Sequence, residues 1–152
     1  MKLAEALIDR ADLQKRAAQL EERIVRNMLV QEGQQPPEDP EGLLREFMDV
    51  TELLELLIPR IHRANLSATL PSGLTLTDAL NRRDMLDLRL KVLRRAADTA
   101  SERQTRYSNS EVRILSVLPA RELQKQVDAL AKARRELETG IQQANWLTEL
   151  PG

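Results

Sequence analysis

Residues 2–31 contain neither glycine nor proline, and their apolar side chains recur at intervals of three and four positions. This spacing gathers the apolar side chains on one face of an α-helix, whereas a half-buried strand needs alternation at every second residue. The same pattern returns in three later stretches, so the sequence predicts four long helices. Their ranges are 2–31, 41–68, 77–100 and 119–148.

The predicted helices indicate an all-α fold. Leucine and alanine dominate the apolar residues, and the chain has only one Phe, one Tyr and one Trp, which favours close helix packing. Helices of roughly 22–31 residues are about 33–46 Å long, and such helices pack readily as antiparallel neighbours. We therefore expect one helical domain over residues 1–152, an antiparallel bundle of four long helices with coiled-coil-like seams.

Proline and glycine residues indicate where the predicted helices end or bend. Gly33 is expected to end the first helix, and the loop over residues 33–40 contains three prolines. Thr75 and Asp78 have the spacing of a capping box at the start of the third helix, with Asp as the weaker variant, and Thr77 is a competing cap. Pro59 lies inside the second helix, where its missing N–H predicts a bend rather than an end.

The segment 111–118 departs from the helical pattern. Its β-branched residues alternate with other residues, which is typical of a strand, and residues 74–76 are the partner that the chain offers. The sequence therefore predicts a small β-ribbon between 74–76 and 111–118. Because an unpaired strand edge invites another chain, we expect this segment beside a subunit interface. The alternative is an irregular lead-in to the fourth helix.

Several chemistries are excluded or disfavoured by residue usage. The chain has no cysteine, which excludes disulfides, thiolate zinc sites and iron–sulfur clusters. His62 is the only histidine, so the paired Glu-x-x-His motifs of a di-iron bundle are impossible. The five glycines are isolated and fit no phosphate-binding loop. We expect no catalytic residues, no metal and no cofactor; the sequence leaves catalysis open but favours a non-enzymatic protein.

The sequence predicts a cytoplasmic protein without membrane contact. No apolar run approaches the roughly 20 residues that a membrane span requires. The first ten residues mix apolar and charged side chains, unlike the apolar core of a secretory signal. The absence of cysteine is compatible with a reducing compartment.

Charge is balanced in total but unevenly distributed. Twenty-three basic and 24 acidic residues give a net charge of -1. Acidic residues concentrate between positions 32 and 55, and basic residues concentrate between positions 82 and 106. Arginine-rich helices can grip phosphates, so nucleic-acid binding through the basic third helix is one alternative. The balanced total and the scarcity of aromatic residues favour charge pairing between helices instead.

Polar residues interrupt the apolar seams at four positions. These polar seam residues are Arg10, Asn27, Arg83 and Arg134. A buried polar side chain at such a position can fix helix register or oligomeric state. Alternatively, the seams shift at these points and the long arginine stems turn outward to water.

Arginine side chains could also converge on an anion. This requires the loop after the third helix to fold back onto the start of that helix. The candidate anionic-ligand site, for a small ligand or an enzymatic reaction, consists of Arg82, Arg83, Asp84, Arg106, Tyr107 and Ser108.

The leading functional prediction is self-association or partner docking through helical faces. Four wide Leu/Ala faces with polar seam residues, and no catalytic constellation, favour this interpretation. We expect a homo-oligomer, most simply a dimer, because two-fold pairing is the default for a self-complementary surface. An anionic-ligand site and nucleic-acid binding are the two alternatives.

Five stretches together suggest a family. They read KLAEALIDRADLQKR, VQEGQQPPEDP, LTLTDALNRRDML, RYSNSEV and IQQANWLTEL. This set resembles the septicolysin-like family of small bacterial proteins, a domain of unknown function, over nearly the whole chain. The resemblance implies a mostly helical fold and no assigned biochemical activity. We carry over no lytic activity, because the sequence offers no amphipathic membrane-inserting hairpin.

Overall fold

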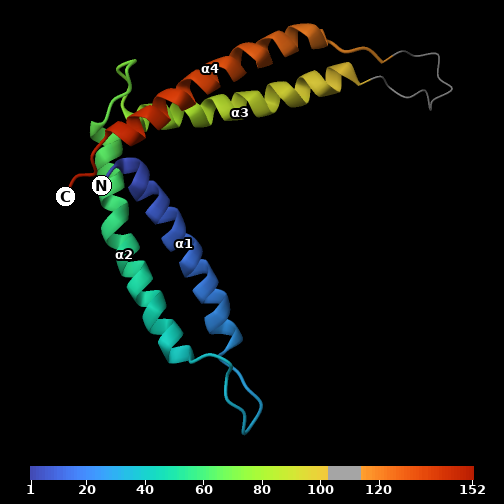
Figure 1. The fold of residues 1–152 in the computed structure, drawn as a ribbon. Coiled ribbons are helices and arrows are strands. Elements are labelled where there is room, and N and C mark those ends of the chain that lie inside the picture. Colours follow the sequence, from blue (N-terminus) through green and yellow to red (C-terminus); the bar gives the residue numbers. More distant parts are fainter. Residues whose placement is uncertain (103–113) are drawn as a thin grey trace, which may run out of the picture. The chain divides into compact units, whose positions relative to one another are not determined.

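The structure, a computed structural model, describes residues 1–102 and 114–152. It contains four α-helices, whose order along the chain Figure 1 shows. They are α1 (Leu3–Arg26), α2 (Pro40–Ser67), α3 (Leu76–Ser101) and α4 (Ala120–Leu147). The predicted all-α fold is confirmed. The predicted boundaries agree with the observed ones to within one residue, except at the end of α1.

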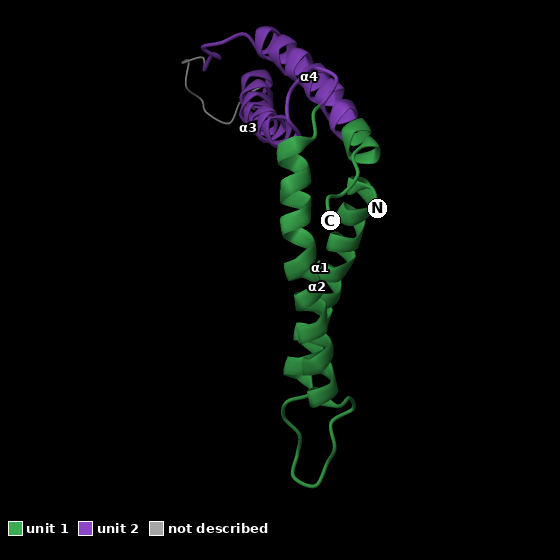
Figure 2. Cartoon of the chain, turned by 90° about the vertical axis from the view of Figure 1, so that its left-hand side faces the viewer, with its two compact units in different colours: residues 1–69, 142–152 green, residues 70–141 purple. Residues whose placement is uncertain are grey.

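The chain divides into two compact units, coloured separately in Figure 2. Unit 1 comprises residues 1–69 and 142–152, and unit 2 comprises residues 70–141. α1 and α2 lie side by side in unit 1, while α3 and most of α4 lie side by side in unit 2 (Figure 1). Within the described ranges, no helix carries an apolar stretch that would cross a membrane.

α1 ends at Arg26 and not at residue 31, because Asn27 caps it early. The backbone N–H of Asn27 donates to the carbonyls of Arg23 and Ile24, both at 3.1 Å, which closes the last turn. The polypeptide then leaves the helix, and Gly33, at φ +84°, forms a turn within the following loop. The expectation that Gly33 ends the helix was therefore wrong.

Side-chain caps begin the next two helices. The Asp39 carboxylate accepts from the backbone N–H groups of Glu41 and Gly42 at 3.2 and 3.0 Å, and Pro40 occupies the first turn of α2. Thr75 caps α3 by accepting from the Asp78 N–H at 3.1 Å. The predicted capping pair at the start of α3 is thus confirmed. α2 continues through Pro59 to Ser67, as the sequence predicts.

Unit 1 is held together by an apolar cluster between α1 and α2. Leu20 is fully buried, and it packs with the buried Leu43 and Val50 of α2. Partly buried side chains surround this cluster, namely Leu13, Ala17, Ile24 and Phe47. The i, i+3 and i+4 spacing along each helix produces this single packing face.

Both helices of unit 2 also bury apolar side chains. They are Leu76, Leu86 and Leu90 of α3, together with Leu123, Val127 and Ile141 of α4. Gly140 has a packing role in α4, because a Cβ atom there would lie 3.0 Å from Cδ2 of Leu70. A larger residue at this position would push on a side chain that is itself buried.

A short antiparallel β-bridge joins the two ends of the chain in unit 1. Lys2 pairs with Glu149, and the flanking hydrogen bonds run from Leu3 N–H to Thr148 O and from Leu150 N–H to Met1 O, both at 2.9 Å. The Lys2 ammonium also lies 2.5 Å from the Glu149 carboxylate. This ion pair holds the pKa of Glu149 below its ordinary value. No sequence pattern predicted this bridge.

The predicted β-ribbon between 74–76 and 111–118 does not form in the described residues. Leu76 is the first residue of α3, and residues 114–118 have no strand conformation. Residues 111–113 of the predicted strand lie outside the described residues. Since the cap at Thr75 starts a helix, it leaves too short an extended segment to pair as a strand. Residues 114–118 instead correspond to the irregular lead-in that was the alternative.

Candidate functional site

Two ion pairs join α3 to α4 in unit 2. The Arg134 guanidinium donates to both carboxylate oxygens of Asp87, at 2.9 and 3.3 Å, and a further nitrogen donates to Glu138 at 3.2 Å. Arg83 lies 3.7 Å from the same Glu138 carboxylate. Asp87 lies four residues after Arg83 on α3, whereas its partner Arg134 lies four residues before Glu138 on α4. This opposite order is expected of antiparallel helices.

These contacts explain two of the predicted polar seam residues. Arg83 and Arg134 lie on the packing faces and are partly buried, and carboxylates of the described chain accompany both. The hydrogen bond from Arg134 lowers the pKa of Asp87 below its ordinary value, and the same bond raises the pKa of Arg134. Sequence reasoning missed Asp87, because its partner lies on a different helix.

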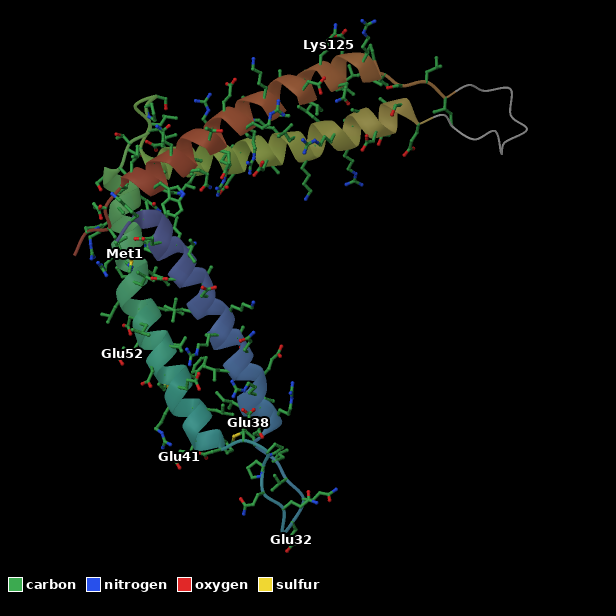
Figure 3. The ribbon with its side chains drawn as sticks, viewed as in Figure 1. Met1, Glu32, Glu38, Glu41, Glu52 and Lys125 are labelled. Carbon is green, nitrogen blue, oxygen red and sulfur yellow. The ribbon has the colours of Figure 1, made fainter. Side chains whose placement is uncertain are left out.

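A similar arrangement in unit 1 holds the loop before α2 against α1. The Arg23 guanidinium donates to the Glu38 carboxylate, and the contact lowers the pKa of Glu38. Asn27 lies beside this pair, with its Nδ2 donating to Arg23 O at 2.8 Å and its Oδ1 accepting from Glu38 N–H at 3.0 Å. Figure 3 shows Glu38 beside the end of α1. Asn27 therefore joins a helix end to a loop.

Arg10 is the remaining polar seam residue. Its side chain is half-buried, and its Nε is enclosed without a hydrogen-bond partner among the described residues. A buried donor without an acceptor is costly. The aliphatic part of the Arg10 side chain is therefore what fits this seam position, and its guanidinium Nε forms no stabilising hydrogen bond with the described residues there.

The candidate anionic-ligand site is only partly within the described residues. Arg82 is exposed on α3, and Arg83 lies 3.5 Å from Asp84 as well as near Glu138. The other three members, Arg106, Tyr107 and Ser108, lie outside the described residues. In the described half of this site, Arg83 thus already faces carboxylates of its own chain. No group of His, Asp and Glu side chains among the described residues converges as metal ligands would.

α3 carries a second apolar stripe on the side opposite its core face. Met85, Leu88 and Val92 are spaced by three and four residues, and each is between 41% and 61% exposed. The core residues Leu86 and Leu90 of the same helix are almost fully buried. An amphipathic surface helix has one apolar face, so a second one is an exposed feature that packing among the described residues of unit 2 does not explain.

This stripe leads into an apolar groove at the end of α3. The groove has a volume of about 640 Å³, and its lining includes Val92, Ala96, Leu115, Val117, Leu118 and Leu123. Val92 thus belongs both to the stripe and to the groove wall. Residues 114–118, the described part of the predicted strand, supply much of the remaining lining. Exposed apolar surface of this kind is typical of interaction sites.

Comparison with known proteins assigns no activity. The chain matches no curated protein. It is similar to a solved structure, the crystal structure of a functionally unknown conserved protein from Corynebacterium diphtheriae. The two are 40% identical, the match covers 99% of each chain, and the TM-score is 0.93. None of these comparisons supports the septicolysin-like name. Residues 10–150 match the family of unknown function DUF6847, and the chain therefore belongs to that family.

Proposed function

We propose that the protein is a non-catalytic helical protein that associates with copies of itself through exposed helical faces. The observation that carries this proposal is the stripe of Met85, Leu88 and Val92 on the outer side of α3. Single exposed apolar residues are ordinary, but a run of them on successive helical turns is the pattern by which helices bind a partner. A cytoplasmic location remains a prediction from the cysteine-free sequence.

The ion pairs of unit 2 favour self-association over the anionic-ligand alternative. Arg83 and Arg134 already face Asp87 or Glu138, so an incoming anion would compete with carboxylates that are part of the fold. The apolar stripe has no such partner within its own helix pair. Association removes that stripe from water, and the hydrophobic effect supplies the driving force.

Light scattering coupled to size exclusion tests the proposal. At micromolar concentrations, the wild-type protein should have at least twice the 17.3 kDa mass of one chain. Leu88→Asp should reduce this mass toward one chain, because it places a charge in the centre of the stripe. Leu29→Asp is the matched control, since Leu29 is 89% exposed and lies outside α3.

Circular dichroism of both variants shows whether their helices are retained. A wild-type mass of one chain across this concentration range would overturn the proposal. If Leu88→Asp and Leu29→Asp lower the mass equally, the stripe is not the contact surface.

A further inference from the structure

The outer side of α2 also combines exposed apolar side chains with charge, here negative. We call this surface the acidic face; it consists of Met48, Asp49, Glu52, Leu53, Glu55 and Leu56. Its three apolar side chains are between 53% and 66% exposed. The core residues Val50 and Leu57 point to the other side of the helix. In Figure 3, Glu52 lies on the side of α2 that faces away from α1.

The carboxylates of the acidic face form no ion pair within the described residues. Asp49, Glu52 and Glu55 are all exposed and lie within two helical turns of each other. Other acidic residues of α2 do form ion pairs: Glu46 pairs with Arg16 of α1, and Glu41 pairs with Arg45. Like charges at this spacing repel one another, so the face gains from an opposite charge brought to it.

The apolar stripe of α3 has the opposite charge along its edges. We call this surface the basic face; it consists of Met85, Leu88, Arg89, Lys91, Val92 and Arg95. The three cations are exposed, and none forms an ion pair with a residue of 1–102 or 114–152. In contrast, Arg83 and Arg134 nearby lie among the carboxylates of unit 2.

The two faces match in size and composition. Each presents three large apolar side chains and three charges of one sign. At 1.5 Å per residue, the acidic face is about 12 Å long and the basic face about 15 Å long. Packing one on the other would bury both apolar sets and bring each surplus charge near the opposite sign. Such complementarity specifies the partner, while apolar burial supplies the driving force.

We propose that the basic face of α3 in one copy packs on the acidic face of α2 in a second copy. This inference rests on the proposed self-association and names its two surfaces. A second copy fits better than a nucleic acid, because phosphates would satisfy Arg89, Lys91 and Arg95 but offer no apolar surface to Met85, Leu88 and Val92. Each copy carries one face of each kind, so the basic face of any copy can meet the acidic face of another.

Charge reversal tests the pairing. Glu52→Lys with Glu55→Lys, and separately Arg89→Glu with Arg95→Glu, should each weaken self-association at least about tenfold by sedimentation velocity. Mixing the two double variants should restore a complex, because each regains an oppositely charged face on the other. Raising the ionic strength should weaken wild-type association, since the charges are exposed and screened by salt.

Matched controls separate pairing from a change in net charge. Glu21→Lys with Glu22→Lys on α1 makes the same charge change as the acidic-face variant at exposed positions. Lys132→Glu with Arg135→Glu on α4 does the same for the basic-face variant. Both controls should associate like the wild type.

The outcomes distinguish this inference from the proposed function. If the wild type associates, but the reversed variants associate as their controls do, the pairing of these faces is overturned and self-association stands. If the mixture of the two variants fails to form a complex, the faces do not contact each other. A wild type that sediments as a single chain overturns both proposals.

Discussion

A single polar residue, Asn27, marks the point where α1 ends. Asn27 is 4% exposed, and its amide satisfies the carbonyl of Arg23 on one side and the N–H of Glu38 on the other. The Glu38 N–H finds its acceptor in this side chain, whereas the Arg23 carbonyl also accepts from the backbone N–H of Asn27. One side chain thus ties the end of α1 to the loop that leads to α2.

Replacing Asn27 should therefore destabilise the fold. Asn27→Ala removes both side-chain hydrogen bonds and takes the acceptor from the Glu38 N–H, which should lower the free energy of unfolding by about 1–3 kcal/mol. Urea unfolding followed by circular dichroism measures this change. The control is Asn81→Ala, which makes the same substitution at an exposed position of α3. Equal midpoints for the two variants would contradict the capping role.

The contact between Arg134 and Asp87 should be visible in a carboxylate titration. Because Arg134 lowers the pKa of Asp87, the folded state binds that proton less readily than the unfolded chain. The stabilisation is present above the ordinary aspartate pKa, and it is lost as pH falls through the lower, folded-state pKa. Arg134→Gln should raise the Asp87 pKa toward its ordinary value, as measured by carbon-13 NMR. Arg135→Gln, at the adjacent exposed arginine, should leave it unchanged.

Sequence periodicity located polar seam residues but not their partners. Arg83 and Arg134 were predicted because they interrupt apolar repeats, and both lie on the faces where α3 meets α4. Asp87 was not predicted, since its contact with Arg134 depends on the register between two helices that lie far apart in sequence. Periodicity reports which side of a helix is packed, whereas register depends on how side chains of the two helices interlock.

At the scale of elements, local capping made the start of α3 predictable. Thr75 with Asp78 marks the start of α3, and the structure has that cap in place. Gly33 misled the prediction for α1, because a glycine in a loop has the same sequence signature as one that ends a helix. The segment 111–118 misled in another way, since its alternation had no long partner strand to pair with.

The packing between α1 and α2 should depend strongly on Leu20. This residue is fully buried between the helices, so Leu20→Ala leaves a cavity and should lower the free energy of unfolding by about 2–5 kcal/mol. Thermal and urea unfolding measure the loss. Leu29→Ala, at a residue that is 89% exposed, should have little effect. A small loss for Leu20→Ala would show that the cluster repacks around the smaller side chain.

At the scale of the whole chain, the total composition does not show that acidic and basic residues lie on different helices. A net charge of -1 suggests a neutral surface, yet the acidic face of α2 and the basic face of α3 each keep three charges without an ion pair among the described residues. The uneven distribution was readable from the sequence. Which charges remain unpaired was not, because the ion pairs formed by Arg16, Arg23 and Arg45 depend on packing in unit 1.

Self-association through these faces would link thermal stability to protein concentration. A contact made only by folded chains stabilises the folded state by mass action, so the melting temperature should rise with concentration. For a chain of this length, each kcal/mol gained should raise it by about 2–4 °C. Differential scanning calorimetry over a hundredfold concentration range measures the trend.

The same dependence separates the assembly from the fold. Glu52→Lys with Glu55→Lys alters exposed side chains only, so the dilute protein should melt as the wild type does. At high concentration the variant should lose the rise in melting temperature, because its α2 face then repels the basic face of a second copy. Glu21→Lys with Glu22→Lys should keep the rise. If the melting temperature of the wild type does not change with concentration, the exposed faces of α2 and α3 form no stable contact between copies.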